Sequence, residues 1–146
     1  MLTRRAEILL VEDNQTDCFL ITEAFSHLGT RNNVHIAKDG VEALLFVKKQ
    51  GEYEKAVTPD LILLDLKMPR VDGLEVLKEI KKDIKLQAIP IIVLTVSKDD
   101  QDLKNAYDLY ANAYIIKPVD IEDYNKLARS IENFWLKNVR LPYIEA

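Results

Sequence analysis

The chain has 146 residues, of which 48% are hydrophobic and 30% charged, and a formal net charge of −4, values typical of one globular domain with a substantial core. No apolar run is long enough to span a membrane, and the amino-terminal segment lacks the pattern of a signal peptide, so we expect a cytoplasmic protein with no membrane partner. The negative balance leaves no basic stripe for DNA, and one cysteine permits no internal disulfide.

Five short runs rich in Ile, Leu and Val alternate with segments of helical period. Runs that are apolar at nearly every position are typical of strands buried on both faces of a parallel sheet. The runs are residues 7–12, 33–37, 60–65, 90–95 and 113–118. Helices are indicated at residues 39–49 and 121–135, and by apolar stripes elsewhere: Cys18, Ile21, Phe25 and Leu28 ahead of an end at Gly29; Leu77, Ile80 and Ile84; Leu103, Ala106 and Tyr110. The alternation predicts an α/β fold, a doubly wound parallel sheet of five strands with helices on both faces.

Polar side chains stand where these strands end. The first strand ends at Glu12 and Asp13, the third at Asp65, the fourth at Thr95 and the fifth at Lys117. In open parallel sheets, ligands bind outside the carboxyl ends of the strands, so we expect these side chains to share one rim. Each alone has a plainer explanation, as a turn or helix cap, a packed strand residue or a solvated lysine. Their occurrence together favours a site.

Three carboxylates on one rim repel one another unless a cation lies between them. Mg²⁺ suits such a rim, because it takes one or two carboxylates and keeps its other positions for water and phosphate oxygens. With a metal present, Asp65 can attack phosphorus, since phosphoryl transfer needs mainly positioning and charge neutralisation. Lys117 supplies a counter-charge, and the Thr95 hydroxyl can donate to a phosphoryl oxygen. The rim therefore predicts an aspartyl phosphate site.

Five motifs in order, "LLVEDN", "DGVEAL", "DLILLDLKMPRVDG", "PIIVLT" and "YIIKPV", resemble the response-regulator receiver domains of two-component signalling, and the resemblance covers residues 7–135. It implies a flavodoxin-like topology with strand order 2-1-3-4-5, a sensor histidine kinase as phosphodonor, and Mg²⁺ as cofactor, with Mn²⁺ as an alternative ion. The implied site residues are Asp65 as phosphoacceptor; Glu12, Asp13, Asp65 and the Lys67 backbone carbonyl as metal ligands; Thr95 and Lys117 as phosphoryl contacts; and Thr95 with Tyr114 as the switch.

Two segments, "KKQGEYEKAVTPDLILLDL" and "IENFWLKNVRLP", are similar to those of the small regulators paired with cyanobacterial and other bacterial phytochromes, which implies a phytochrome-type kinase. Two positions depart from the wider family. Val96 follows Thr95 where many receivers have a smaller residue, so its bulk is expected to restrict approach to the phosphoryl group. Lys67 adds a mobile positive charge beside Asp65. For both reasons, no dephosphorylation rate carries over from the family.

Two other classes use similar parts. A hydrolase of the haloacid-dehalogenase type also has a strand-end aspartate nucleophile with Mg²⁺, but typically a second aspartate two residues later, where this chain has Lys67. A flavin-binding protein of the same topology would have a phosphate loop rich in Ser and Thr after the first strand, where this chain reads "VEDNQTD". We expect a signalling protein rather than an enzyme, with self-acting phosphotransfer and dephosphorylation only.

Residues 1–136 are expected to form the receiver domain, and residues 137–146 a tail without an output domain. The core stripe of the last helix is Tyr124, Leu127, Ala128, Ile131 and Trp135, which leaves Phe134, Leu136, Val139, Leu141, Tyr143 and Ile144 as surplus apolar residues. An apolar patch of this kind predicts an interface, here a symmetric homodimer built from the end of the last helix and the tail. The alternative is a tail that folds over its own domain. We expect structural roles for Cys18, as a packed core thiol, and for His27 and His35, which have no neighbouring ligands in the sequence.

Overall fold

A computed structural model describes residues 4–142, in which five strands form one parallel sheet. The strands are β1 (Ala6–Val11), β2 (Asn32–Ala37), β3 (Leu61–Leu64), β4 (Ile91–Thr95) and β5 (Ala113–Ile116). They lie in the order β2-β1-β3-β4-β5, and all the pairs are parallel. The predicted strands and strand order are confirmed, with ends that differ by one or two residues.

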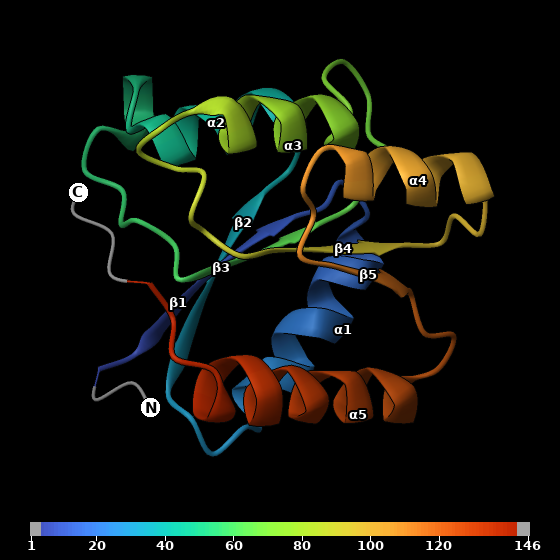
Figure 1. Cartoon of the computed structure of the whole chain (residues 1–146). Coiled ribbons are helices and arrows are strands. Elements are labelled where there is room, and N and C mark those ends of the chain that lie inside the picture. The colour runs from blue at the N-terminus through green and yellow to red at the C-terminus, as the bar shows by residue number, and fades with distance from the viewer. Residues whose placement is uncertain (1–3, 143–146) are drawn as a thin grey trace.

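Helices cover both faces of this sheet (Figure 1). One face carries α1 (Gln15–Ser26) and α5 (Ile121–Ile131). The other carries α2 (Gly40–Lys48), α3 (Gly73–Lys82) and α4 (Asp100–Asp108). A short 3-10 helix, η1 (Gly51–Tyr53), lies in the long loop before β3. The doubly wound architecture is therefore confirmed, with one apolar core on each face of the sheet.

The centre and the edges of the sheet differ in burial. Every residue of β3 and β4 is buried, as expected for strands with neighbours on both sides and helices on both faces. Strands β2 and β5 form the two edges and are mostly half-buried, with Ile36 and Ile116 exposed. The expectation that all five strands are buried on both faces is thus wrong at the edges, because an edge strand has a strand on one side only.

Each helix begins just beyond the carboxyl end of a strand, with a side chain that accepts a hydrogen bond from a backbone N–H of its first turn. These N-caps are Asn14, Asp39, Asp72, Asp99 and Asp120. A cap of this kind typically stabilises a helix by about 1 kcal/mol. The caps hold the loops at the carboxyl edge in defined positions, which matters because the predicted site is made from those loops.

Some residues expected on the apolar stripes face solvent. Helix α1 ends at Ser26, before Gly29, and its C-cap is His27. Ile84 lies beyond the end of α3 and is 84% exposed. Tyr110 follows α4 in a left-handed conformation, with φ of 71°, and is also exposed. In these cases the apolar spacing continues past the true end of the helix. It therefore predicted core positions for residues that lie in the turns after the helices.

Beyond α5 the chain continues as a π-helix, η2 (Glu132–Asn138). Leu136 is only 1% exposed, and Leu141 also packs against the core between α1, α5 and the sheet. Counting these two as surplus is therefore wrong, since Leu136 of η2 and Leu141 of the tail both pack against their own domain. Phe134 is 55% exposed and remains available for contacts. Two other residues of that set, Tyr143 and Ile144, lie outside the described residues.

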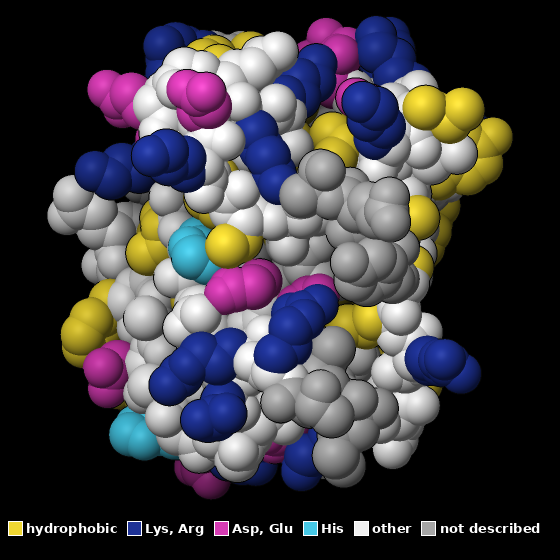
Figure 2. Space-filling model, turned by 90° about the vertical axis from the view of Figure 1, so that its left-hand side faces the viewer, with side chains coloured by type: hydrophobic (Ala, Val, Ile, Leu, Met, Phe, Trp, Pro, Cys, Tyr) yellow, Lys and Arg dark blue, Asp and Glu magenta, His cyan; other side chains and the backbone are white. Residues whose placement is uncertain are grey.

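The face at the amino ends of the strands, opposite the predicted site, is strongly charged (Figure 2). Lys and Arg side chains gather on it in two groups, with carboxylates and a histidine between them. At this end of the sheet, Lys81 Nζ donates to the backbone oxygens of Gln87 (3.0 Å) and Ile89 (2.9 Å) and to Asn112 Oδ1 (3.0 Å). These bonds join the loops that precede β4 and β5.

None of the helices within residues 4–142 has the length and apolar character needed to cross a membrane.

Candidate functional site

The predicted side chains meet at the carboxyl edge of the sheet. Glu12, Asp65, Thr95 and Lys117 are all buried there, and Asp13 is exposed. Lys117 Nζ lies 2.6 Å from Glu12 Oε1 and 3.3 Å from Asp65 Oδ2. Carboxylate oxygens of Glu12, Asp13 and Asp65 lie within 4.8 Å of one another. The convergence expected from parallel strand ends is therefore present in the structure.

Two glycines allow the loops around Asp65 to pack this closely. A Cβ on Gly73, the first residue of α3, would lie 2.1 Å from the backbone oxygen of Asp65. A Cβ on Gly40, the first residue of α2, would lie 2.2 Å from the backbone oxygen of Val71. In each "DG" pair of the sequence, the aspartate thus caps a helix and the glycine leaves room for a neighbouring loop.

Burial and charge shift two neighbouring pKa values in this cluster. Burial raises the pKa of Glu12 to about 7, against the opposing effect of its hydrogen bond with Lys117. Burial lowers the pKa of Lys117, but hydrogen bonds to Asp17 and Glu12 and the nearby Asp65 charge outweigh it and leave that pKa above its ordinary value. Lys117 is therefore a permanent cation, held among more carboxylates than it can neutralise.

Asp17, in the first turn of α1, belongs to this cluster, and sequence reasoning missed it. Its Oδ2 lies 2.8 Å from Lys117 Nζ, and its Oδ1 accepts from the Tyr124 hydroxyl at 3.2 Å. An acid in a first helical turn is ordinarily explained by the helix dipole, which hid this second role. A usable signal was its position, three residues after the cap Asn14 and directly beyond the strand-end acids.

The donor set suits a hard divalent cation such as Mg²⁺, which prefers oxygen ligands. Glu12, Asp13 and Asp65 offer carboxylate oxygens, and Asp13 lies at the exposed side of the group, where an ion would keep contact with water. The Lys67 backbone lies beside them, since its N–H donates to Asp65 Oδ1 at 3.4 Å. A bound ion would offset the excess negative charge of the carboxylates and of phosphoryl oxygens.

Ser97 links the two residues expected to act as the switch. Its N–H donates to Thr95 Oγ1 at 3.4 Å, and its backbone oxygen accepts from the Tyr114 hydroxyl at 3.0 Å. Thr95 ends β4, which lies next to β3, and Asp65 directly follows β3. Val96 is largely exposed, and its predicted effect on access stays a prediction.

The sequence led us to expect a mobile positive charge at Lys67, and in the structure this side chain pairs with a carboxylate of α4. Its Nζ lies 3.1 Å from Asp102 Oδ2, in the first turn of α4. The Ser97 hydroxyl donates to the same Asp102 oxygen at 2.5 Å. The hydrogen bond from Ser97 and, to a smaller extent, the contact with Lys67 hold the pKa of Asp102 below its usual value.

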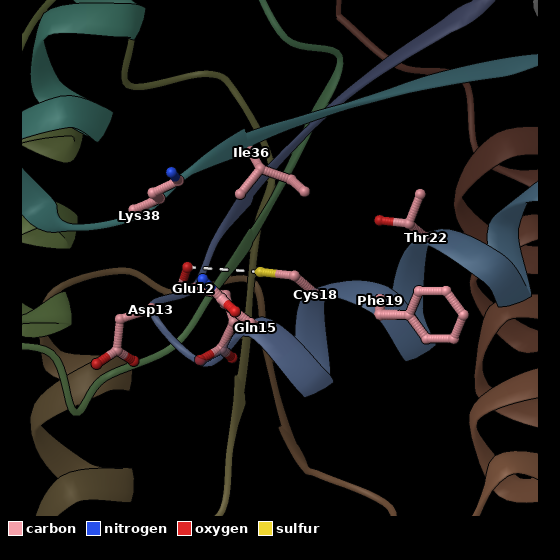
Figure 3. Close-up of a pocket in the computed structure, with 8 residues that line it drawn as sticks. All are labelled: Glu12, Asp13, Gln15, Cys18, Phe19, Thr22, Ile36 and Lys38. Carbon is pink, nitrogen blue, oxygen red and sulfur yellow. Dashed lines mark hydrogen bonds between the residues drawn. The ribbon is translucent and has the colours of Figure 1, made fainter.

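A cavity of about 380 Å³ lies beside the acidic pair, between α1 and β2. Figure 3 shows Cys18 and Phe19 of α1 and Ile36 of β2 around it. Cys18 is half-buried, and its Sγ donates to the backbone oxygen of Glu12 at 3.6 Å. Burial, with nearby carboxylates, raises the pKa of its thiol to about 11. The expected core thiol is therefore only partly confirmed, because Cys18 also lines this cavity.

The two histidines have partners outside the cluster. His27 Nε2 lies 3.9 Å from Glu23 Oε2 on α1. His35 Nε2 lies 3.3 Å from Glu7 Oε2, and its ring centroid lies 5.5 Å from that of Phe46. The expectation that His35 lacks a neighbouring ligand is therefore wrong, because the parallel register of β1 and β2 brings Glu7 close to it.

Comparison with known proteins agrees with this geometry. Residues 8–129 match the family model described as the response regulator receiver domain. Response regulator Rcp1 from Synechocystis sp. is 43% identical over 135 residues, which are 92% of each chain. The "Probable methanogenesis regulatory protein FilR2" from Methanothrix harundinacea is 42% identical over 135 residues, which are 92% of this chain and 86% of that one.

Solved structures extend the likeness to the whole fold. The crystal structure of the phosphorylated cyanobacterial phytochrome response regulator RcpA superposes with a TM-score of 0.92 at 42% identity and covers 96% of this chain and 100% of that one. The Mn²⁺-bound form of Rcp1 gives 0.89 at 42% identity, with 94% and 99% covered. The chain therefore belongs to the response regulator receiver domain family.

Proposed function

We propose that this protein is a single-domain response regulator that accepts a phosphoryl group on Asp65 and signals through phosphorylation-dependent binding to another protein. The observation that carries the proposal is the position of the Asp65 carboxylate, which lies within 4.8 Å of two further carboxylates and 3.3 Å from a buried ammonium. Two residues later the chain has Lys67, paired with Asp102, where a haloacid-dehalogenase-type hydrolase would have its general acid.

The chain's own residues have separate tasks in this chemistry. An Asp65 oxygen attacks phosphorus, and the bond from phosphorus to the donor's leaving group breaks. Lys117 holds its proton and offsets charge on the phosphoryl oxygens, and the Thr95 hydroxyl donates to one of them. Glu12 and Asp13 would hold Mg²⁺ or Mn²⁺ with Asp65 and the Lys67 carbonyl, and the ion supplies further neutralisation. We propose no catalytic activity beyond this phosphotransfer and the self-acting hydrolysis of the acyl phosphate.

The phosphodonor in this proposal is a histidine kinase of the phytochrome type, with the transfer taking place in the cytoplasm. Its support is the likeness to RcpA, a phytochrome response regulator, over 96% of this chain. FilR2, a methanogenesis regulatory protein by its name, is as similar in sequence, so the kinase type needs a direct test. Phosphotransfer from each histidine kinase of the same organism should be fastest from a phytochrome-type kinase, and a faster transfer from another class would reject this assignment.

Labelling with acetyl phosphate and Mg²⁺ tests the phosphoacceptor. One acid-stable, base-labile phosphoryl group is expected, and Asp65→Asn should abolish it. Asp60→Asn is the matched control, because Asp60 lies at the other end of β3, where its carboxylate binds Arg4. Label at the wild-type level in Asp65→Asn would reject the proposal. Asp13→Asn should retain the acceptor but weaken Mg²⁺ binding, and an unchanged Mg²⁺ titration would remove Asp13 from the metal site.

We further propose a symmetric homodimer through the end of the last helix, here η2, and the tail, with no DNA partner. The exposed Phe134 ring, which packs edge-to-face against Trp135 with centroids 5.3 Å apart, supports it. The inward packing of Leu136 and Leu141 leaves the dimer less apolar surface than the sequence suggested. Sedimentation at micromolar concentration should give a dimer that Phe134→Ser weakens and Phe19→Ser, an exposed aromatic on α1, does not. A wild-type monomer, phosphorylated or not, would reject the dimer.

A further inference from the structure

One set of contacts near the site has no task in the proposed chemistry. Lys67 follows β3, Ser97 lies in the loop between β4 and α4, and Asp102 is in the first turn of α4. The Asp102 carboxylate receives both the Lys67 ammonium, at 3.1 Å, and the Ser97 hydroxyl, at 2.5 Å. Asp102 is 13% exposed, so its charge is largely withdrawn from water and depends on these two partners.

Ser97 also contacts Thr95 and Tyr114, the two residues that the family resemblance implies as the switch. Its N–H donates to Thr95 Oγ1, and its backbone oxygen accepts from Tyr114. If Thr95 turns toward a phosphoryl group on Asp65, the bond from the Ser97 N–H must lengthen or break. If Tyr114 turns inward, its bond to the Ser97 oxygen must break as well. Any force that fixes Ser97 therefore opposes both movements.

Asp102 and Lys67 supply such a force. The hydroxyl of Ser97 is bound to a carboxylate on α4, and that carboxylate is tied to the loop that carries the Asp65 neighbour Lys67. Asp102, at the start of α4, thus connects Ser97 of the β4–α4 loop to Lys67 of the loop that follows β3. A second ion pair on α4, between Lys104 and Asp108 at 2.5 Å, joins two residues of the same helix one turn apart and fixes no loop.

We propose that Lys67 and Asp102 form a latch that holds Ser97, and through it Thr95 and Tyr114, in the unphosphorylated arrangement. Both are positioning residues, since neither side chain contacts Asp65. The latch rests on the proposed function, because it acts on the conformations between which phosphorylation selects. Opening it raises the population of the phosphorylated arrangement before any phosphoryl group is present, and a ligand specific for that arrangement then binds more tightly.

Beryllium trifluoride, an anion that occupies a phosphoryl position on a carboxylate, is the probe, used with saturating Mg²⁺ on the full chain. Asp102→Asn should tighten the binding of this anion about two- to fivefold, which is the change in affinity that corresponds to the energy of a typical ion pair near the surface. Asp108→Asn is the matched control, because it removes the same charge from the same helix without touching Ser97, and its affinity should equal that of the wild type. The comparison separates the latch from a general effect of net charge.

A double-mutant cycle isolates the pair. Lys67→Gln breaks the same contact from the exposed side. The double variant Lys67→Gln/Asp102→Asn should therefore bind beryllium trifluoride about as tightly as Asp102→Asn alone, and not with the product of the two single-variant gains. Hydrogen exchange without the anion gives a second readout, in which amides 96–99 should exchange faster in Asp102→Asn than in Asp108→Asn. If Asp102 had a purely structural role, Asp102→Asn would raise hydrogen exchange throughout the domain, and it would weaken the binding of the anion rather than tighten it.

The outcomes separate the latch from the function on which it rests. If wild type and Asp65→Asn show the same lack of response to the anion, the phosphoacceptor assignment fails and the latch fails with it. If wild type responds but Asp102→Asn and Asp108→Asn are alike in affinity and exchange, the latch alone is overturned. If the effects of Lys67→Gln and Asp102→Asn add in full, the two residues act independently, and the latch is again overturned.

Discussion

Two lysines at opposite ends of the sheet each bind three oxygen atoms, and the charge of those partners differs. Lys117, at the carboxyl end, is bound by the carboxylates of Glu12, Asp17 and Asp65. Lys81, at the amino end, is bound by three neutral oxygens, two from the backbone and one from an amide side chain. Carboxylates leave the pKa of Lys117 raised in spite of its burial, whereas burial lowers the pKa of Lys81.

The different partners indicate different roles: Lys117 offsets the charge of a carboxylate cluster, whereas Lys81 connects two loops. The carboxyl end gathers more negative charge than its ammonium can offset, so its stability should depend on added cations. At the amino end each hydrogen bond of the Lys81 ammonium goes to a neutral acceptor, so the contribution of Lys81 should not depend on them. Substitutions matched between the two ends test this contrast directly.

The largest effect is expected from Lys117→Met, which keeps apolar volume and removes the ammonium. Removing one partner of a buried ion pair typically costs about 3–5 kcal/mol, because the other partner stays buried and unpaired. We expect urea unfolding in EDTA to show a loss of about 3 kcal/mol, partly restored by millimolar Mg²⁺. Lys81→Met should cost about 1–3 kcal/mol through unpaired carbonyls, with the same value in EDTA and in Mg²⁺. An equal Mg²⁺ response in both variants would remove the contrast.

A smaller effect is expected from Gly73→Ala. The added Cβ would lie 2.1 Å from the Asp65 backbone oxygen, so the loop after β3 or the start of α3 must shift. Overpacking of this kind typically costs about 1–3 kcal/mol, and here it should also slow phosphorylation, because the shift moves Asp65 itself. Gly29→Ala is the control at the amino end, where the nearest atom to a new Cβ lies 3.8 Å away. Unfolding and acetyl phosphate labelling of Gly29→Ala should match the wild type. If Gly73→Ala also matches the wild type in both measurements, close packing at Gly73 does not matter for the site.

Strand positions and the rim were predictable because their signals are local and periodic. Apolar runs located the five strands to within two residues, and parallel strands bring their carboxyl ends together by topology, so Glu12, Asp65, Thr95 and Lys117 had to meet. The sequence pattern could not show where helices stop, which is why Ile84 was assigned to a core from which it is excluded.

Side-chain partners beyond the strand ends were not predictable in the same way. Asp17 and Asp102 both lie in first helical turns, where an acid has an ordinary local explanation, and only the tertiary structure shows that each binds a lysine distant in sequence. Leu136 was misplaced for a related reason. The π-helix that follows α5 changes the direction of its side chains, so the spacing of a regular helix assigned it to the wrong face.

A further step down in size is expected from Asp17→Asn, which keeps the shape of the side chain but removes one of three negative partners of Lys117. One weakened charge-assisted hydrogen bond at a partly exposed site should cost about 1 kcal/mol in unfolding. Labelling at Asp65 should persist, since Lys117 retains Glu12 and Asp65. Tyr124→Phe removes only the longer hydrogen bond, 3.2 Å, from the tyrosine hydroxyl to Asp17 and should cost less. Labelling lost in Asp17→Asn as completely as in Asp65→Asn would instead make Asp17 part of the chemistry.

The smallest effect is expected at Asp39, a half-buried carboxylate of the same rim whose cationic partner is exposed. Asp39 caps α2 and pairs with the largely exposed Arg70. The backbone N–H of Glu42, and then Arg70, hold the pKa of Asp39 below its usual value. A lowered folded-state pKa adds stability above the unfolded-state pKa of 3.8, and that stability disappears as pH falls through the folded-state pKa. Asp39→Asn keeps a capping oxygen and loses the charge, so it should cost about 0.5 kcal/mol at pH 7. The deficit in urea unfolding should shrink as the pH is lowered from 4.5 to 3 and should also shrink in 1 M salt. A deficit that stays constant over both changes would assign the loss to capping geometry, and charge at this part of the rim would then contribute nothing measurable.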